Sequence, residues 1–542
     1  MTTRNAKQAR EIGVHDGEVL VRGGLVADGS GEVPRERDVL VRGGRIVAVE
    51  PAGGIPATDR PVLDATGLVV APGFIDVHSH ADNAPLLTEH DTSKILQGVT
   101  TEVVGNCGFS LAPCAPQHQE TLTSLLQRIF PPVPLEWRDW PELDARLQAH
   151  GFVTNYAPLV GHGTLRIAAF GMVDRAPDDD ETKLMRRSLE DALDAGVFGM
   201  STGLIYPPGV YSTTDELVGL ADVLGPDRVY ATHMRGESDG LLDSIDEALL
   251  IGQQAGCPVH ISHLKWFGRH NWGRIPEAIE RIGAAADAGT AVTNDVYPYT
   301  AASTMLAALL PPTLLVDSDE AVLERLRDPA QRDRIAQAIE HGLPGWHNMV
   351  QDCGWGGILV STTASHAYEG LTLEQVAQEL DVEPVDALIR ILVEERMQAS
   401  MVTFGLSEDD VVRVLAHERT VIGSDGLPPG RGGRPHPRMF GTFPRYLGRY
   451  VRDQNLLPLG DAVRRLTATP AEIFRIPERG RVEPGYVADL VAFDAGRITD
   501  HCDYLDPVQT PSGIAWVMMA GQTVAEAGVF LGQRNGRRLT PA

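Results

Sequence analysis

The stretch "GFIDVHSH" at residues 73–80 places two histidines one residue apart at the end of an apolar run. Residues i and i+2 of a β-strand point to the same face of its sheet. His78 and His80 can therefore direct both imidazole rings toward one point. A histidine pair in this position is a candidate for metal binding.

Seven further short apolar stretches follow the first and alternate with helical patterns. One such helix is "DDETKLMRRSLEDALDAG" (179–196), where Ala-Gly is a C-terminal stop signal. Eight strands in alternation with helices predict a (β/α)₈ TIM-like barrel, which we assign to residues 69–474. The strands are expected within residues 69–78, 99–107, 152–162, 197–204, 228–234, 258–264, 291–299 and 420–425.

The two ends of the chain resemble each other and differ from the middle. Residues 18–31 and 39–51 are short alternating strands with Gly-Gly turns, and residues 485–496 and 514–532 have the same style. We therefore expect residues 1–68 and 475–542 to form one small β-sandwich domain.

The segment between the last two expected strands is too long for a simple loop. Residues 300–419 contain charged helical stretches and the strand-like piece "GGILVSTTAS". This pattern predicts an inserted subdomain at about 300–360, with an outer limit at 419, placed to act as a lid.

Composition limits the partners. The 542 residues carry a formal net charge of −26, which disfavours nucleic acid and anionic lipid. The sequence shows no apolar run of membrane-spanning length, a polar N-terminus and five scattered cysteines. We expect a cytoplasmic protein that acts on a small molecule, with no nucleic acid or membrane partner, and we leave open a homo-oligomer.

Metal-binding residue types recur where the expected strands end. Besides the histidine pair after strand one, Cys107, His233, His263 and Asp425 end the second, fifth, sixth and eighth strands. The C-terminal ends of barrel strands form the active site in this fold. Each residue alone is as easily explained by packing or a turn, but together they predict a metal site.

Zinc suits this set, because it accepts thiolate, imidazole and carboxylate ligands together. Cys107, His233 and His263 would leave a fourth position open for water. His78, His80 and Asp425 could form a second, weaker site. Alternatively, His80 serves as an electrophile and Asp425 as a proton shuttle.

The chain resembles the D-aminoacylase (N-acyl-D-amino-acid deacylase) group of the amidohydrolase superfamily over residues 18–530. The general signals are "PGFIDVHSH", the histidines after strands five and six, and "GSD". The more specific signals are "GVTTEVVGNCGFSLAP" (98–113), "GMSTGLIYPPGVYS" (199–212), "THMRGE" (232–237), "ISHLK" (261–265), "DVYPYTAAST" (295–304) and "HPRMFGTFPR" (436–445).

The resemblance implies a role for each matching residue. Cys107, His233 and His263 match the ligands of a tightly held zinc; His78, His80 and Asp425 match a second site. Asp425 also matches the catalytic acid/base. Lys265, Tyr297 and Arg438 match residues that bind the substrate carboxylate, and Tyr206 matches a further substrate contact. Without the resemblance, the lysine and arginine would be read as surface charges and Tyr297 as barrel packing.

The implied activity is zinc-dependent hydrolysis of N-acyl-D-amino acids. Trp266, Phe267, Trp272 and Trp355 favour an apolar side chain if they lie near the barrel mouth, although lid packing explains them equally well. Another amide hydrolase of this fold, acting on cyclic imides, hydantoins or bulky N-acyl and peptidyl amides, is the alternative. The cyclic amide hydrolases typically use a carboxylated lysine on the fourth strand, and "VFGMSTGLIY" offers none. A non-catalytic metal-binding scaffold is the remaining alternative.

Overall fold

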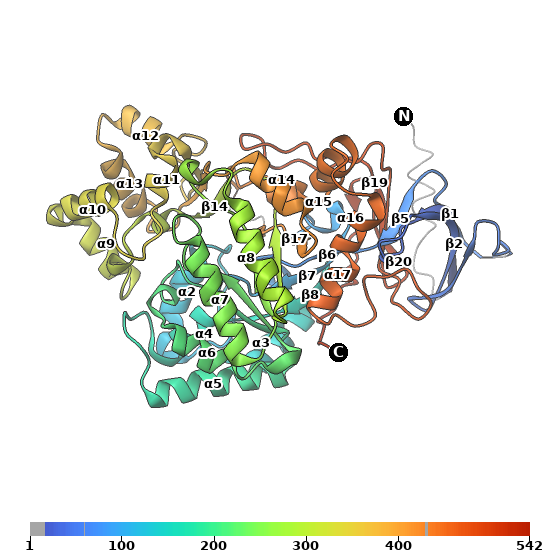
Figure 1. Cartoon of the computed structure of the whole chain (residues 1–542), viewed down its shortest axis with the longest axis horizontal. Coiled ribbons are helices and arrows are strands. Elements are labelled where there is room, and N and C mark those ends of the chain that lie inside the picture. The colour runs from blue at the N-terminus through green and yellow to red at the C-terminus, as the bar shows by residue number, and fades with distance from the viewer. Residues whose placement is uncertain (1–16, 59, 429–431) are drawn as a thin grey trace.

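The computed structural model describes residues 17–58, 60–428 and 432–542, so residues 1–16 of the expected N-terminal segment lie outside the described residues. The chain forms three parts along the long axis of the molecule (Figure 1). A central barrel lies between a sheet built from both ends of the chain and an inserted subdomain at the opposite end.

Parallel strands close the predicted barrel. They are β6 (Phe74–Asp76), β7 (Val99–Val104), β8 (Asn155–Pro158) with its continuation β9 (Val160–Gly161), β10 (Gly199–Gly203), β11 (Val229–His233), β12 (Val259–Ile261), β13 (Val292–Val296) and β17 (Thr420–Ile422). A parallel bridge between Ser79 and Gly426 joins the last strand to the first. The (β/α)₈ prediction is confirmed.

Helices cover the outside of the barrel, as the alternation of strand and helix patterns in the sequence predicts. They include α4 (His162–Phe170), α5 (Asp179–Asp194), α6 (Thr214–Ala221), α7 (Leu241–Ala255), α8 (Ile275–Asp287), α14 (Glu408–Ala416), α16 (Leu459–Leu466) and α17 (Ala468–Ile473). Helix α5 begins at a capping box, in which Asp178 and Glu181 satisfy each other's backbone N–H groups. It ends before Gly196, which adopts φ +83°.

Both ends of the chain contribute to one nine-stranded sheet. Its order is β21 (Val529–Phe530), β20 (Gln522–Glu526), β19 (Ile514–Met519), β18 (Leu490–Phe493), β5 (Val69–Pro72), β1 (Glu18–Val26), β2 (Arg35–Arg42) and β3 (Arg45–Pro51), with β4 (Val62–Asp64) beside β1. The antiparallel pair β18 and β5 joins the N-terminal strands to the C-terminal ones. Val39, Val70, Leu490 and Trp516 lie in the core of this sheet.

The first expected barrel strand, 69–78, is divided between two sheets. Its first half is β5 of the terminal sheet, and its second half is β6 of the barrel. The chain changes sheets at Gly73, where a Cβ atom would lie 2.2 Å from Oγ1 of Thr100. A side chain has no room at this crossing, which explains the glycine.

The inserted subdomain spans residues 302–403. A three-stranded antiparallel sheet, in the order β14 (Ala302–Met305), β16 (Ser400–Thr403), β15 (Ile358–Thr362), carries α9 (Asp319–Arg327), α10 (Pro329–His341), α11 (Met349–Cys353), α12 (Leu373–Leu380) and α13 (Pro384–Glu394). The "GGILVSTTAS" stretch forms β15, whereas β14 and β16 were not expected from the sequence. Both strands have only four residues and show no clear alternation of apolar and polar side chains.

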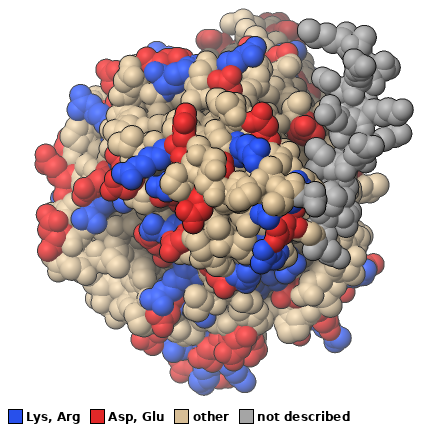
Figure 2. Space-filling model, turned by 90° about the vertical axis from the view of Figure 1, so that its right-hand side faces the viewer, with Lys and Arg blue, Asp and Glu red and all other residues tan. Residues whose placement is uncertain are grey.

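Charge on the face of the terminal sheet is mixed, with Lys and Arg scattered among Asp and Glu (Figure 2). No helix within the described residues is long and apolar enough to span a bilayer.

The C-terminal tail returns to the barrel. The backbone N–H of Leu539 donates to the carbonyl of Tyr156 on β8, and the Leu539 side chain packs in the cluster that includes Ile75, Phe198 and Phe474. The tail therefore fastens the terminal segment to the barrel interior.

Replacing Leu539, which is 6% exposed, by Ala should cost about 2 to 5 kcal/mol, because a buried leucine is lost and a cavity remains. We expect a lower melting temperature by calorimetry. The matched Leu531→Ala change, at a position 40% exposed, should leave it nearly unchanged. Equal melting temperatures for the two variants would contradict this role of the tail.

Candidate active site

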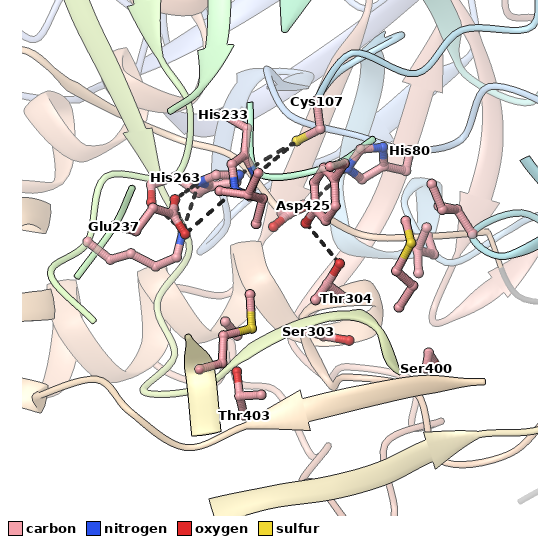
Figure 3. A pocket seen from close by; sticks show the side chains of 18 of the residues that line it. His80, Cys107, His233, Glu237, His263, Ser303, Thr304, Ser400, Thr403 and Asp425 are labelled. Carbon is pink, nitrogen blue, oxygen red and sulfur yellow. Dashed lines mark hydrogen bonds and ion pairs between the residues drawn. The ribbon is translucent and has the colours of Figure 1, made fainter. Parts of the chain in front are cut away.

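Barrel closure brings the expected strand-end residues to one mouth. His78 and His80 follow β6, Cys107 follows β7, and His233 is the last residue of β11. His263 follows β12, and Asp425 follows β17. All six side chains are buried, and several converge on one point (Figure 3).

The sulfur of Cys107 is the centre of this cluster. Sγ lies 3.3 Å from Nε2 of His78, 3.6 Å from Nε2 of His263 and 3.7 Å from Nδ1 of His233. The sulfur therefore contacts histidines of both expected metal sites.

Asp425 faces the histidine pair. Its Oδ1 lies 3.1 Å from Nε2 of His80 and 3.6 Å from Nε2 of His78. Nδ1 of His78 lies 3.2 Å from Oδ2 of Asp295, which also lies 3.0 Å from Nε2 of His260. Asp295 thus fixes the ring of His78 from behind, as a carboxylate does for a metal-binding histidine.

The donor set fits zinc. Zn–S and Zn–N bonds of about 2.3 and 2.0 Å separate tetrahedral ligand atoms by about 3.5 Å, close to the distances around Cys107. Three groups of described residues have ligand atoms that all lie within 4.8 Å of one another. They are His78–Cys107–His263, His78–His80–Asp425 and His233–Glu237–His263.

Charge in the cluster favours thiolate and carboxylate. Burial would raise the pKa of the Cys107 thiol, but the charge of His78 and contacts with His233 and His263 hold it well below its usual value. Burial acts against ionisation of Asp425 too, yet Arg438 and His78 hold its pKa well below the usual range. Burial by itself would lower the pKa of His80. The contacts with Asp425 and Cys107 outweigh burial and raise this pKa to about 9.

Three of these residues adopt the left-handed backbone region that favours glycine. Cys107, His263 and Asp425 have φ of 54°, 38° and 50°. Such conformations cost on the order of 1 kcal/mol or more each and concentrate at functional sites. Here they turn the chain sharply at the strand ends, so that the side chains face the mouth.

A cavity of about 730 Å³, its open mouth included, lies over the cluster. Nine of the ten sequence-predicted site residues line it, and His78 lies just beneath, in contact with Cys107. The volume is ordinary for a small-molecule site.

The residues expected to contact the substrate differ in whether their polar groups already have protein partners. The hydroxyl of Tyr297 is buried without a partner among the described residues, and burial holds its pKa well above the usual value, so it is a neutral donor. Arg438 lies 2.9 Å from Oδ2 of Asp425 and donates to the carbonyl of Ser303. The Tyr206 hydroxyl lies 2.8 Å from Oγ1 of Thr304 on the insertion.

Lys265 is already engaged. Its Nζ lies 2.5 Å from Oε1 of Glu237, 2.9 Å from Nδ1 of His263 and 3.1 Å from the His263 carbonyl. The Glu237 carboxylate and the His263 carbonyl accept hydrogen bonds from the ammonium, and Nδ1 of His263 lies near both the ammonium and Glu237.

Glu237 lines the cavity and is a site residue that the sequence analysis missed, as it missed Asp295 behind His78. Glu237 is 2% exposed, and Lys265, His233 and His263 hold its pKa well below the usual value despite burial. Oε1 lies 3.1 Å from Nδ1 of His263. The available signal was its position four residues after His233 within "THMRGE".

The insertion forms the opposite wall of the cavity. Ser303, Thr304, Met305, Ser400 and Thr403 of its sheet line the cavity, together with His347 and Met349 (Figure 3). Of the four aromatic residues considered for side-chain preference, Phe267 alone lines it. Trp266 is buried beneath Arg274, Trp272 is 46% exposed, and Trp355 packs against the core.

Comparison with known proteins agrees with this architecture. The model of the amidohydrolase family matches residues 61–525. The chain belongs to this family. As an amidohydrolase it is a hydrolase of amide bonds, and its resemblance to the D-aminoacylase group is confirmed by full-length relatives.

The D-aminoacylase of Alcaligenes xylosoxydans xylosoxydans is 37% identical over 535 residues, 96% of this chain and 97% of that protein. The N-acyl-D-aspartate deacylase of the same organism is 36% identical over 97% of this amidohydrolase and 95% of its own length. The structure of N-acyl-D-glutamate deacylase from Bordetella bronchiseptica, complexed with zinc and a phosphonate inhibitor, matches with TM-score 0.81 and 35% identity, covering 96% and 99% of the two chains.

The low pKa of Cys107 can be tested without metal. Burial raises the pKa of the other four cysteines, Cys114, Cys257, Cys353 and Cys502, to about 11, 11, 12 and 12. In the metal-free protein at neutral pH, wild type should therefore show the ultraviolet absorbance of one thiolate, which Cys107→Ser should lack. Cys257→Ser is the control and should match wild type. Identical spectra for Cys107→Ser and wild type would contradict the thiolate.

Proposed function

We propose that this amidohydrolase cleaves the N-acyl amide bond of N-acyl-D-amino acids to give a carboxylate and a free D-amino acid. The observation that carries the proposal is the convergence of Cys107, four histidines and Asp425 beneath a cavity that also holds an arginine and a tyrosine hydroxyl with no partner among the described residues. Relatives that bear deacylase names at 36–37% identity support it.

Cys107, His233 and His263 would hold one zinc ion tightly, and His78, His80 and Asp425 a second, weaker one. The ion would supply the means to activate water at neutral pH and to polarise a carbonyl. Glu237 would orient His263 and keep Lys265 in place.

Asp425 is the proposed proton carrier. Its carboxylate is ionised and positioned beside His80, so it can accept a proton from the attacking water. It then delivers this proton to the nitrogen of the leaving amino acid as the C–N bond breaks. His80 can donate a hydrogen bond to the carbonyl oxygen as negative charge develops there.

Substrate orientation would come from the α-carboxylate. The hydroxyl of Tyr297 and the guanidinium of Arg438, 4.8 Å from the Tyr297 ring, are the proposed anchors. Lys265 and Tyr206 also line this cavity. A D-residue is selected when carboxylate, acyl carbonyl and side chain each have a fixed position.

An apolar side chain is favoured by the cavity lining. Phe109, Ile129, Ile205, Phe267, Met305 and Met349 contribute to it. Arg128 also lines the cavity, but it is ion-paired with Asp319 of the insertion. The pairing partly neutralises the charge that Arg128 presents to the cavity.

Zinc-loaded wild type should release free amine from N-acetyl-D-leucine and not from the L-enantiomer. Asp425→Asn should lower kcat by about 10² to 10⁴, because the proton carrier is lost. Asp386→Asn, which removes a carboxylate paired with Arg332 far from the mouth, is the control and should remain active. Release from the L-form alone, or full activity of Asp425→Asn, would refute the proposal.

Tyr297→Phe should raise KM by about 10- to 100-fold, since a hydrogen bond to a charged carboxylate contributes about 1.5 to 3 kcal/mol. The melting temperature should not fall, because this hydroxyl has no hydrogen-bond partner among the described residues to lose. Tyr299→Phe is the matched control and should leave KM unchanged. An unaltered KM for Tyr297→Phe would remove Tyr297 from the carboxylate site.

A further inference from the structure

A second cavity, of about 1030 Å³ with its opening included, adjoins the first. The two share one wall, to which both the barrel loops and the insertion contribute. Residues that line both are Ile129, Ser303, Ser400, Asp425, Leu427 and Arg438. The proposed proton carrier, Asp425, thus stands where the two cavities meet.

The two carboxylate oxygens of Asp425 have different surroundings. Oδ1 faces His80 at 3.1 Å, on the side of the metal-binding cluster. Oδ2 lies 2.9 Å from Nη1 of Arg438, which lines both cavities. A scissile amide beside this carboxylate would place its two substituents on different sides of the shared wall.

The residues that line each cavity indicate which end of the substrate it would bind. Tyr297, Lys265 and Tyr206 line the first cavity and not the second, so the carboxylate end of the substrate belongs in the first. The lining of the second cavity includes Pro131, Pro435, Met439, Phe440 and Val508.

Charge in the second cavity does not favour an anion. Its charged lining among the described residues consists of Glu89, Asp425 and Arg438. Arg438 also lines the first cavity, where the α-carboxylate would use it, and Glu89 would repel a negative group in the second. The occupant that fits is therefore uncharged and largely apolar.

From this arrangement we infer that the second cavity binds the acyl group, and that the preferred substrates carry an uncharged acyl chain of several carbons rather than acetyl. The inference rests on the proposed function and deepens it. An acetyl group would leave most of the cavity unused, whereas a longer chain would cover Met439, Phe440 and Val508.

Longer acyl chains should raise kcat/KM in the wild type. Burial of one methylene corresponds to about fourfold in an equilibrium constant. Because the cavity is open on one side, we expect a gain of at least about tenfold from N-acetyl- to N-octanoyl-D-leucine.

The test compares N-acetyl-, N-butanoyl- and N-octanoyl-D-leucine on zinc-loaded enzyme and two tryptophan variants. Val508 is 56% exposed and lines the second cavity, so Val508→Trp narrows it without disturbing the core. The matched control is Val529→Trp, at a position 60% exposed on β21 that lines neither cavity. Val508→Trp should abolish the octanoyl advantage, so that kcat/KM for N-octanoyl-D-leucine falls to the value for N-acetyl-D-leucine, and Val529→Trp should behave as wild type.

Product inhibition gives an independent readout. Octanoate should inhibit turnover of N-acetyl-D-leucine more strongly than acetate in the wild type, and Val508→Trp should remove that difference. The ratio of activity on D-leucine and D-phenylalanine derivatives should stay constant in this variant, because their side chains belong in the first cavity.

Equal kcat/KM for acetyl and octanoyl substrates in the wild type would overturn the inference. So would a Val508→Trp variant that loses both substrates equally, or one that changes side-chain preference instead. In each of these outcomes deacylation itself persists. If wild type releases D-leucine from none of the three, the proposed function fails, and the acyl site fails with it.

Discussion

Asp76 holds the first strand of the barrel against the last, and the active site depends on that contact. Its carboxylate accepts hydrogen bonds from the backbone N–H of Ser424 at 2.8 Å and from the Ser424 hydroxyl at 2.5 Å. It also accepts one from the backbone N–H of His78, at 3.2 Å. The buried Nζ of Lys94 lies 3.5 Å away and balances the charge. Residues almost 350 positions apart are thereby fixed side by side, and His80 meets Asp425 because of it.

Closure of the barrel also forces the site into conformations that are energetically unfavourable. Left-handed backbone at Cys107, His263 and Asp425 is unfavourable for side chains other than glycine. The cluster also gathers a thiolate and carboxylates in a buried volume, where unpaired charge is expensive. The histidines, Lys265 and Arg438 offset that charge, and the closed barrel holds the arrangement in place. Glu237 contributes to this balance, because its carboxylate pairs with the buried ammonium of Lys265.

Different parts of the fold supply the metal-binding cluster and the opposite wall of the cavity. The barrel supplies the cluster, and the insertion supplies Ser303, Thr304, Met305 and Met349 as the opposing wall. Relatives named for different substrates are similarly distant from this chain, at 35–37% identity. Overall identity therefore does not choose among these substrates. The ion pair between Arg128 and Asp319 is one local feature of the cavity lining, because it joins a barrel loop to the insertion.

The sequence by itself determined the barrel and the metal-binding residue types at the ends of its strands. Strand and helix periodicity are local properties, and the C-terminal ends of parallel strands converge whatever the details, so His78, His80, Cys107, His233, His263 and Asp425 could be named in advance. The tertiary structure alone decided what depends on distance between remote segments. Such features are the change of sheet at Gly73, the strands β14 and β16, the contact of the Cys107 sulfur with both histidine groups, and the engagement of Lys265 by Glu237. No local pattern encodes them, because each arises from the packing of side chains that lie far apart along the chain.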